Sequence, residues 1–146
     1  IRRITESEGS RFDGSLPNYV KFGDCKNVEI YEPEDDSRVF YEKIKILLIP
    51  SQWGEAFGRV VIEAMANGIP VIASNVAGLK DSVGNGGILL EKDDINSWIK
   101  EIQKLSDKNY YSSISKNAKV FIHENYSEEK IIKETQKLIE RTVKLR

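Results

Sequence analysis

Apolar residues along this chain form short runs in its first half and helical stripes in its second half. Four short runs predict β-strands: 28–31, 44–49, 70–74 and 86–90. The run at 44–49 is nearly continuous and ends at Pro50, which is typical of a strand buried on both faces of a parallel sheet. Strands that alternate with helices along a chain indicate a parallel α/β sheet.

Five segments have the pattern of helices. The first is short, begins at Asp35 or Asp36 as its cap, and ends at Tyr41. The second covers about 57–67 with Gly68 as its stop signal. Three amphipathic helices follow, the first capped by Asp94 and the last starting at Ser127. The apolar stripe of the first is Ile95, Trp98, Ile99, Ile102 and Leu105, and that of the second is Tyr111, Ile114, Ala118, Phe121 and Ile122. The apolar stripe of the last is Ile131, Ile132, Leu138, Ile139, Val143 and Leu145.

The start of the chain has a different composition from the rest. Residues 1–27 mix Gly, Ser, Asp and Pro, which predicts an irregular segment, interpreted as the remnant of a truncated first strand-helix unit. We therefore predict one domain over 28–146, in an α/β fold with a Rossmann-like parallel sheet flanked by helices and a helical C-terminal tail. The chain starts at Ile1 rather than Met, which suggests a fragment of a longer protein.

Composition excludes several classes of protein. The chain has 146 residues, 40% of them hydrophobic and 31% charged, as expected for a globular domain with a real core. Its formal net charge of −1 gives no indication of nucleic acid or of an anionic membrane as a partner. No apolar run reaches the roughly 18 residues of a membrane span. A single cysteine, Cys25, rules out an intrachain disulfide and fits a cytoplasmic location.

The candidate chemistry lies in the loop 50–58, between a buried strand and a helix. Ligands of open parallel sheets bind beyond the carboxyl ends of the strands, and the amides at a helix N-terminus favour an anion such as phosphate. Gly58 leaves room for a close approach, so a larger residue there is expected to block the anion while the helix start otherwise tolerates it. Arg59 opposes the helix dipole, a conflict that a bound anion would relieve.

Two carboxylates flank this loop. Glu63 lies in a helix that is apolar on almost every face and therefore expected to be buried, whereas Glu55 precedes it. Carboxylates accept hydrogen bonds from hydroxyls, so Glu63 suits a ribose and Glu55 other hydroxyls; with the anion, this describes a nucleotide sugar. The alternative is that Arg59 and Glu63, four residues apart, simply pair on the helix surface, and that Glu55 is a solvated loop residue.

The stretch PSQWGEAFGRVVIEAMANGIPVIAS, residues 50–74, closely resembles the donor-binding segment of the retaining glycosyltransferases of family 4, which have the GT-B fold. Glu55 and Glu63 match that family's E-x7-E motif, and the resemblance extends from about Asn27 to the C-terminus. It implies that this chain is the C-terminal, donor-binding half of a GT-B enzyme. Its implied site residues are Glu55, Ala56 and Phe57 for the donor sugar, Gly58, Arg59 and Val60 for the diphosphate, Glu63 for the ribose, and Ile30, Tyr31 and Glu32 for the nucleobase.

The resemblance also implies an activity: transfer of a hexose from a nucleoside diphosphate sugar to an acceptor, with retention and without a metal ion or other cofactor. The acceptor-binding domain is absent from this chain, so the isolated chain is expected to be inactive. Membrane association is expected only through a lipid or glycan acceptor. Family members carry Arg and Lys upstream that neutralise the diphosphate, and Arg2, Arg3 and Lys21 do not align with them. Two alternatives stay open: a GT-B nucleotide-sugar epimerase, and a non-catalytic nucleotide-binding domain.

Three further features carry less information. His123, the only histidine, is interpreted as a surface or packing residue of a late helix. Trp53 lies in the proposed site and either stacks on the ligand or packs within its loop. The segment 74–80 is expected to be a loop that lines the sugar pocket.

Overall fold

The computed structural model describes residues 36–144, and the side chains of 36–143. The predicted strand 28–31, the predicted boundary at 27/28 and the expected nucleobase contacts Ile30, Tyr31 and Glu32 lie outside these residues. By its internal contacts the chain divides into two units, Ile1–Phe40 and Tyr41–Arg146. Almost everything described below belongs to the second unit.

Helix α1 (Ser37–Tyr41) begins where the sequence predicts it. The Asp36 carboxylate accepts a hydrogen bond of 3.0 Å from the Arg38 amide, which confirms Asp36 as the capping residue. The same carboxylate pairs with the Arg38 guanidinium at 2.8 Å. These hydrogen bonds from Arg38 hold the pKa of Asp36 below its usual value.

Strands β1 (Leu47–Ile49), β2 (Val71–Ser74) and β3 (Ile88–Leu90) form a parallel sheet in the order β1-β2-β3. The parallel sheet is therefore confirmed for the described strands, although β1 is shorter than the predicted run 44–49. The Leu47 amide donates to the Pro70 carbonyl at 3.0 Å. Because Pro70 has no N–H to donate in return, the pairing of β1 and β2 does not extend further toward their N-termini.

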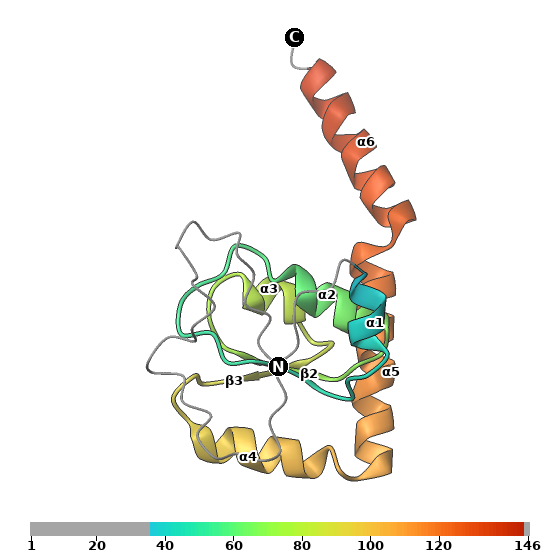
Figure 1. Cartoon of the computed structure of the whole chain (residues 1–146). Helices are drawn as coiled ribbons and strands as arrows, with labels where there is room; N and C mark the ends of the chain where they lie inside the picture. Colours follow the sequence, from blue (N-terminus) through green and yellow to red (C-terminus); the bar gives the residue numbers. More distant parts are fainter. Residues whose placement is uncertain (1–35, 145–146) are drawn as a thin grey trace. The chain divides into compact units, whose positions relative to one another are not determined.

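Helices cover both faces of this sheet (Figure 1): α2 (Arg59–Ala66) and α3 (Leu79–Val83) lie on one face, and α4 (Ile95–Lys104) lies on the other. Because successive strand residues point to opposite faces, Ile72 faces α4 while Val71 and Ala73 face α2 and α3. Ile72 forms a core cluster with Trp98 and Leu105. The core on the α2 and α3 side includes fully buried residues from these helices, namely Val61, Ala64, Met65, Leu79 and Val83.

The sequence pattern did not predict α3, and it predicted a wider buried face for α4 than the structure has. The loop expected over 74–80 overlaps the start of α3 at Leu79, and at 5 residues α3 is too short to show a helical period. Asp94 caps α4 as predicted, accepting from the Ser97 amide at 3.1 Å. Its apolar stripe is wider than the buried face, however, because Ile95 and Ile99 are 69% and 49% exposed.

Helix α5 (Lys108–Tyr126) is fastened by side-chain hydrogen bonds to the segments that precede β1 and β2. Tyr111 Oη donates to the Lys45 carbonyl at 3.0 Å, and Ser115 Oγ donates to the Gly68 carbonyl at 2.6 Å. Gly68 has a φ of 73°, the left-handed conformation that ends α2 where the sequence predicts a stop. The sequence therefore located both the end of α2 and the stripe of α5 that contains the buried Ala118.

A buried carboxylate links α4 to α5. Glu101, 7% exposed, accepts hydrogen bonds from Lys104 Nζ at 2.8 Å and from Tyr110 Oη. Burial raises the pKa of Glu101, but these two hydrogen bonds outweigh it, so the pKa lies below its usual value. The hydrogen bond to Glu101 raises the pKa of Tyr110 to about 12, and burial acts in the same direction.

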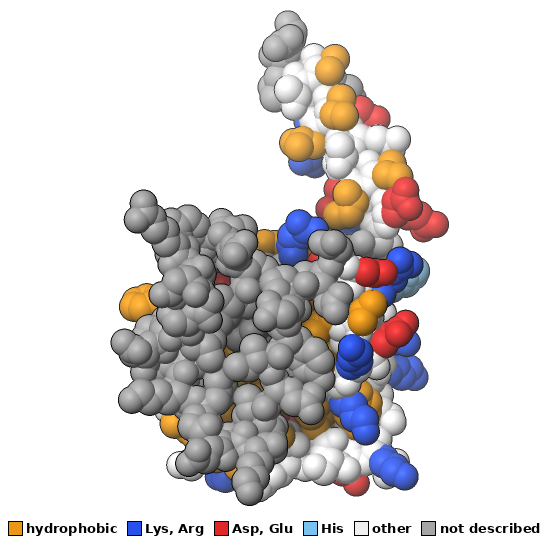
Figure 2. Space-filling model, in the orientation of Figure 1, with side chains coloured by type: hydrophobic (Ala, Val, Ile, Leu, Met, Phe, Trp, Pro, Cys, Tyr) orange, Lys and Arg blue, Asp and Glu red, His pale blue; other side chains and the backbone are white. Residues whose placement is uncertain are grey.

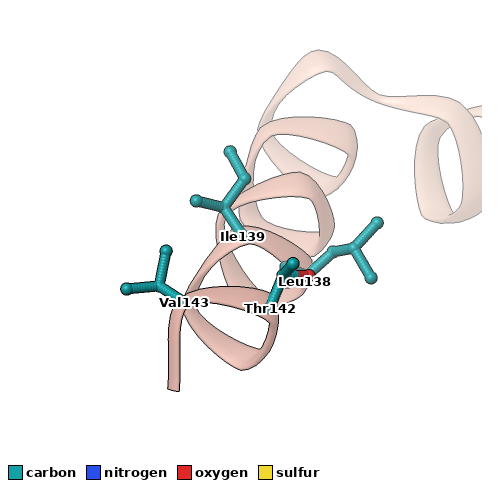
Figure 3. Close-up of a pocket in the computed structure, with 4 residues that line it drawn as sticks. All are labelled: Leu138, Ile139, Thr142 and Val143. Carbon is teal, nitrogen blue, oxygen red and sulfur yellow. Dashed lines mark hydrogen bonds between the residues drawn. The ribbon is translucent and has the colours of Figure 1, made fainter. Parts of the chain in front are cut away.

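Helix α6 (Glu128–Lys144) starts directly after Ser127, as predicted, and its apolar side chains are exposed. Figure 2 shows hydrophobic side chains along the surface of α6. Ile139 and Val143 project to one side of the helix and Leu138 to another (Figure 3), with exposures of 57%, 67% and 64%. The predicted stripe is therefore present, but little within the described residues covers it.

Candidate functional site

Three loops meet at the carboxyl edge of the sheet, where a parallel α/β fold binds its ligands. They follow β1, β2 and β3 and are joined by hydrogen bonds. Lys92 Nζ donates to the Gln52 carbonyl at 3.3 Å, and Asn75 Nδ2 donates to Glu91 Oε1 at 2.7 Å. The backbone amide of Glu55 donates to the Ala77 carbonyl at 3.0 Å. We call these joined loops the rim: residues 50–58, 75–78 and 91–94.

Glu55 is held in the rim by both its backbone and its side chain. Its carboxylate accepts a hydrogen bond from Ser51 Oγ, and the residue is half-buried. A Cβ placed on Gly78 would lie 1.7 Å from the Glu55 carbonyl oxygen, so only glycine allows the two backbones to approach this closely. Glu55 is therefore a fixed carboxylate rather than a freely solvated loop residue.

Gly58 is the residue that precedes α2, and its backbone conformation and its packing both restrict which residue fits there. Its φ of 70° and ψ of 54° are left-handed, and a Cβ there would lie 2.7 Å from Cδ2 of the buried Leu79. The expectation that the helix start tolerates a larger residue is wrong, because this conformation and this packing both require glycine. Clearance for an anion is not needed to explain it.

The first turn of α2 has the features of an anion site. Gly58 has no side chain to cap it, and the first turn contains no acidic residue. The Arg59 side chain is 86% exposed and Val60 is 45% exposed, so this end of the helix faces outward. The expectation that α2 is buried on every face is therefore wrong. The dipole at this end still favours a negative charge.

Glu63 is neither isolated nor fully buried. Its Oε2 accepts a hydrogen bond of 2.8 Å from Tyr41 Oη, and its Oε1 lies 3.9 Å from Arg59 Nη2. The side chain of Glu63 is 38% exposed. The premise of a lone acid in an apolar helix is thus wrong, and the alternative pairing of Arg59 with Glu63 is present, although at this distance and exposure it contributes little stability.

Ala56 and Phe57, both expected to contact the donor sugar, have different surroundings. Ala56 is exposed in the loop. The Phe57 ring packs edge-on against Tyr126, with ring centroids 5.8 Å apart and an interplanar angle of 73°. Tyr126 Oη also donates to the Asp81 carbonyl at 3.2 Å, and burial, followed by the Asp81 charge, raises the pKa of Tyr126. Phe57 therefore already has a structural partner on α5.

The exposure of Trp53 and His123 tests the roles that the sequence suggested for these two residues. Trp53 is 82% exposed, so packing within its own loop is not its role. His123 is exposed on α5, in agreement with a surface residue. Within residues 36–143, no group of three or more His, Cys, Asp and Glu side chains is placed to hold a metal ion. Within the same part of the chain, no helix is long and apolar enough to cross a membrane.

Sequence reasoning missed three residues that shape the site. Tyr41 and Glu63 are separated by 22 residues, so no local pattern relates them. Neither Ser51 nor Gly78 was predicted to contact Glu55, yet both fix it.

The fold is a parallel α/β sheet with an uncapped helix N-terminus at its carboxyl edge, and comparison with known proteins identifies the family. The sequence model described as "Glycosyl transferases group 1" matches residues 25–140. This chain belongs to the group 1 glycosyltransferases.

Individual relatives agree. The capsular polysaccharide biosynthesis glycosyltransferase CapM of Staphylococcus aureus is 31% identical over 124 residues, which are 83% of this chain and 32% of CapM. A D-inositol 3-phosphate glycosyltransferase of Corynebacterium kroppenstedtii is 38% identical over 109 residues, 73% of this chain and 23% of the relative. The chain thus spans about a third or less of the length of these two relatives.

Solved structures show the same fold. Sucrose-phosphate synthase from Thermosynechococcus elongatus is 31% identical, with a TM-score of 0.64 over 75% of this chain and 28% of that one. Anabaena HepE in complex with UDP-glucose is 22% identical, with a TM-score of 0.61 over 70% of this chain and 29% of that one. The predicted fold class is confirmed: a Rossmann-like parallel sheet flanked by helices, with a helical C-terminal tail, as in the C-terminal half of a GT-B fold.

Proposed function

We propose that this chain is the donor-binding domain of a family 4 glycosyltransferase, which moves a hexose from a nucleoside diphosphate sugar to an acceptor with retention. The observation that carries the proposal is the arrangement around α2 in a member of this family: an outward-facing, uncapped helix start between Glu55 and Glu63. We assign the domain to 28–146 and 1–27 to an irregular segment before it. The cytoplasmic location and an acceptor domain upstream stay predictions.

Each part of the donor has a matching group in this proposal. The diphosphate lies at the amides from Gly58 to Val60, where the helix dipole and Arg59 favour its charge. The ribose hydroxyls donate to Glu63 and the sugar hydroxyls to Glu55. HepE shares this fold and its structure holds UDP-glucose, which supports the view that such a fold accommodates a nucleotide sugar.

The chain's contribution to catalysis is to hold the leaving group. As the glycosidic bond breaks, negative charge grows on the diphosphate, and fixed amides and a cation at that place stabilise the transition state without having to reorganise. The hydrogen bonds that join the rim hold the loops around this helix start together before the donor binds. The groups that bind the acceptor must come from outside this chain, so we expect the isolated chain to bind donor but to transfer no sugar.

The test measures nucleotide affinity by titration calorimetry with UDP, ADP, GDP and their glucose conjugates. Glu63→Gln keeps the shape of the side chain and removes its charge, so we expect affinity for the preferred diphosphate to fall by roughly 1–3 kcal/mol. Glu55→Ala is expected to lower the affinity for the glucose conjugate and to leave the affinity for the nucleoside diphosphate unchanged. Glu124→Gln, at an exposed position of α5, is the matched charge control.

Two outcomes contradict the assignment. The first is unchanged nucleotide affinity in Glu63→Gln while the variant remains folded by circular dichroism. The second is an equal loss of diphosphate and conjugate in Glu55→Ala, which would remove the sugar role from Glu55. Retention is tested separately, on the full-length enzyme, by NMR of the anomeric configuration of the product.

A further inference from the structure

The hydroxyl of Tyr41 meets one oxygen of the carboxylate to which the ribose role is assigned. Tyr41 Oη donates to Glu63 Oε2 at 2.8 Å across 22 residues of chain. Tyr41 is 8% exposed, so packing fixes its ring. Glu63 is more exposed and has three rotatable bonds, so its carboxylate depends on such a partner to keep one orientation.

The two oxygens of Glu63 have unequal partners. Oε2 has the buried, neutral hydroxyl of Tyr41, and Oε1 faces the Arg59 guanidinium at 3.9 Å. The Arg59 side chain is 86% exposed and free to swing toward an anion, so it fixes the carboxylate poorly. Orientation of Glu63 therefore rests on Tyr41.

We propose that Tyr41 is a positioning residue for ribose recognition: it holds the Glu63 carboxylate in the orientation that accepts the ribose hydroxyls. This inference rests on the proposed function, because it assumes that Glu63 binds ribose. A carboxylate oxygen accepts more than one hydrogen bond, so the bond from Tyr41 leaves acceptor capacity for the ligand. Because Tyr41 restricts Glu63 before binding, the ligand loses less affinity to ordering of the side chain.

A purely structural role gives a different expectation. A buried tyrosine hydroxyl needs an acceptor, and Glu63 is one. If that were the whole purpose of the bond, removing the hydroxyl would lower stability and would weaken all nucleotides alike. Positioning instead affects only ligands that present ribose hydroxyls. The pair of ligands that separates the two roles is a nucleoside diphosphate and its 2′,3′-dideoxy analogue.

The experiment uses the full chain with whichever of UDP, ADP and GDP raises its melting temperature most, together with the 2′,3′-dideoxy form of the same nucleotide. The measured quantity is the affinity ratio of the ribose form to the dideoxy form. Tyr41→Phe is expected to lower this ratio about three- to tenfold, the size of one net hydrogen bond, while dideoxy affinity is unchanged. Tyr111→Phe is the matched control, because its hydroxyl bonds to the Lys45 carbonyl at 3.0 Å and not to Glu63.

Glu63→Gln separates the two hypotheses. If it lowers the ratio and Tyr41→Phe does not, the proposed function holds and the inference about Tyr41 is overturned. If neither variant lowers the ratio, or if none of the three diphosphates binds the wild-type chain, the ribose role of Glu63 fails and takes the inference with it. In the double variant, the loss is expected to equal that of Glu63→Gln alone, because Tyr41 acts only through Glu63.

Discussion

Substitution of Gly58 is expected to destabilise the fold rather than to affect only a ligand. In Gly58→Ala, a side chain must adopt a φ near 70°, which costs about 1–2 kcal/mol for an L-residue. The new Cβ would also lie 2.7 Å from Cδ2 of the fully buried Leu79. Overpacking of this kind costs about 1–3 kcal/mol.

One effect acts in the opposite direction. Alanine restricts the unfolded chain more than glycine does and so stabilises by about 0.4–1 kcal/mol. The net expectation for Gly58→Ala is a loss of roughly 1–5 kcal/mol in the free energy of unfolding. This is a large share of the 5–15 kcal/mol typical of a domain.

The assay is urea unfolding followed by circular dichroism, with two other glycines of the rim for comparison. A Cβ on Gly54 would make only ordinary contacts, with the Ala77 Cβ at 3.7 Å and the Ala77 carbonyl oxygen at 3.8 Å, so Gly54→Ala is expected to be nearly neutral. A Cβ on Gly78 would lie 1.7 Å from backbone, so Gly78→Ala is expected to be the most damaging of the three. If Gly58→Ala unfolds at the same urea concentration as Gly54→Ala, the reasoning about Gly58 is refuted.

Two further predictions concern regions away from the rim. Deleting α6 after Ser127 is expected to change the melting temperature of the remaining chain by less than Gly58→Ala does, because the α6 side chains Leu138, Ile139 and Val143 are mostly exposed; loss of cooperative unfolding on this truncation would contradict it. The Tyr110 pKa is raised to about 12, so its bond to Glu101 contributes stability below the unfolded pKa near 10 and loses it as pH rises through 12. Tyr110→Phe is therefore expected to lower the free energy of unfolding by about 1–3 kcal/mol at pH 7, with the difference from wild type shrinking above pH 10; a difference that is constant with pH would rule this out.

Features that depend on a few neighbouring residues were predictable from the sequence. Asp36 and Asp94 cap the helices that they precede, and Gly68 ends α2, because each acts on backbone groups within a few positions. The parallel sheet also followed from its apolar runs. The edge of the sheet at which the candidate site lies was predicted from the general rule that ligands of parallel sheets bind beyond the carboxyl ends of the strands.

Features that depend on distant packing were not predictable. The conformation of Gly58 and its contact with Leu79 come from the packing of α2 against α3, and α3 itself was missed. The same holds for Glu63, which looked unpaired because its partner Tyr41 lies far back in the sequence. For α6, the period of the apolar residues gives the face but not what covers it.

The hydrogen bonds of the rim also determine when the site can form during folding. The bond from Lys92 to the Gln52 carbonyl joins residues 40 apart, and the bond from Asn75 to Glu91 joins residues 16 apart. Contacts this distant in sequence form slowly, because a long loop must close before any of them is made. During synthesis, the rim contact of Gln52 therefore forms only after Lys92 has left the ribosome, and that of Glu55 only after Ala77 has done so. A nascent chain that ends before Lys92 contains the whole E-x7-E motif yet lacks the assembled rim.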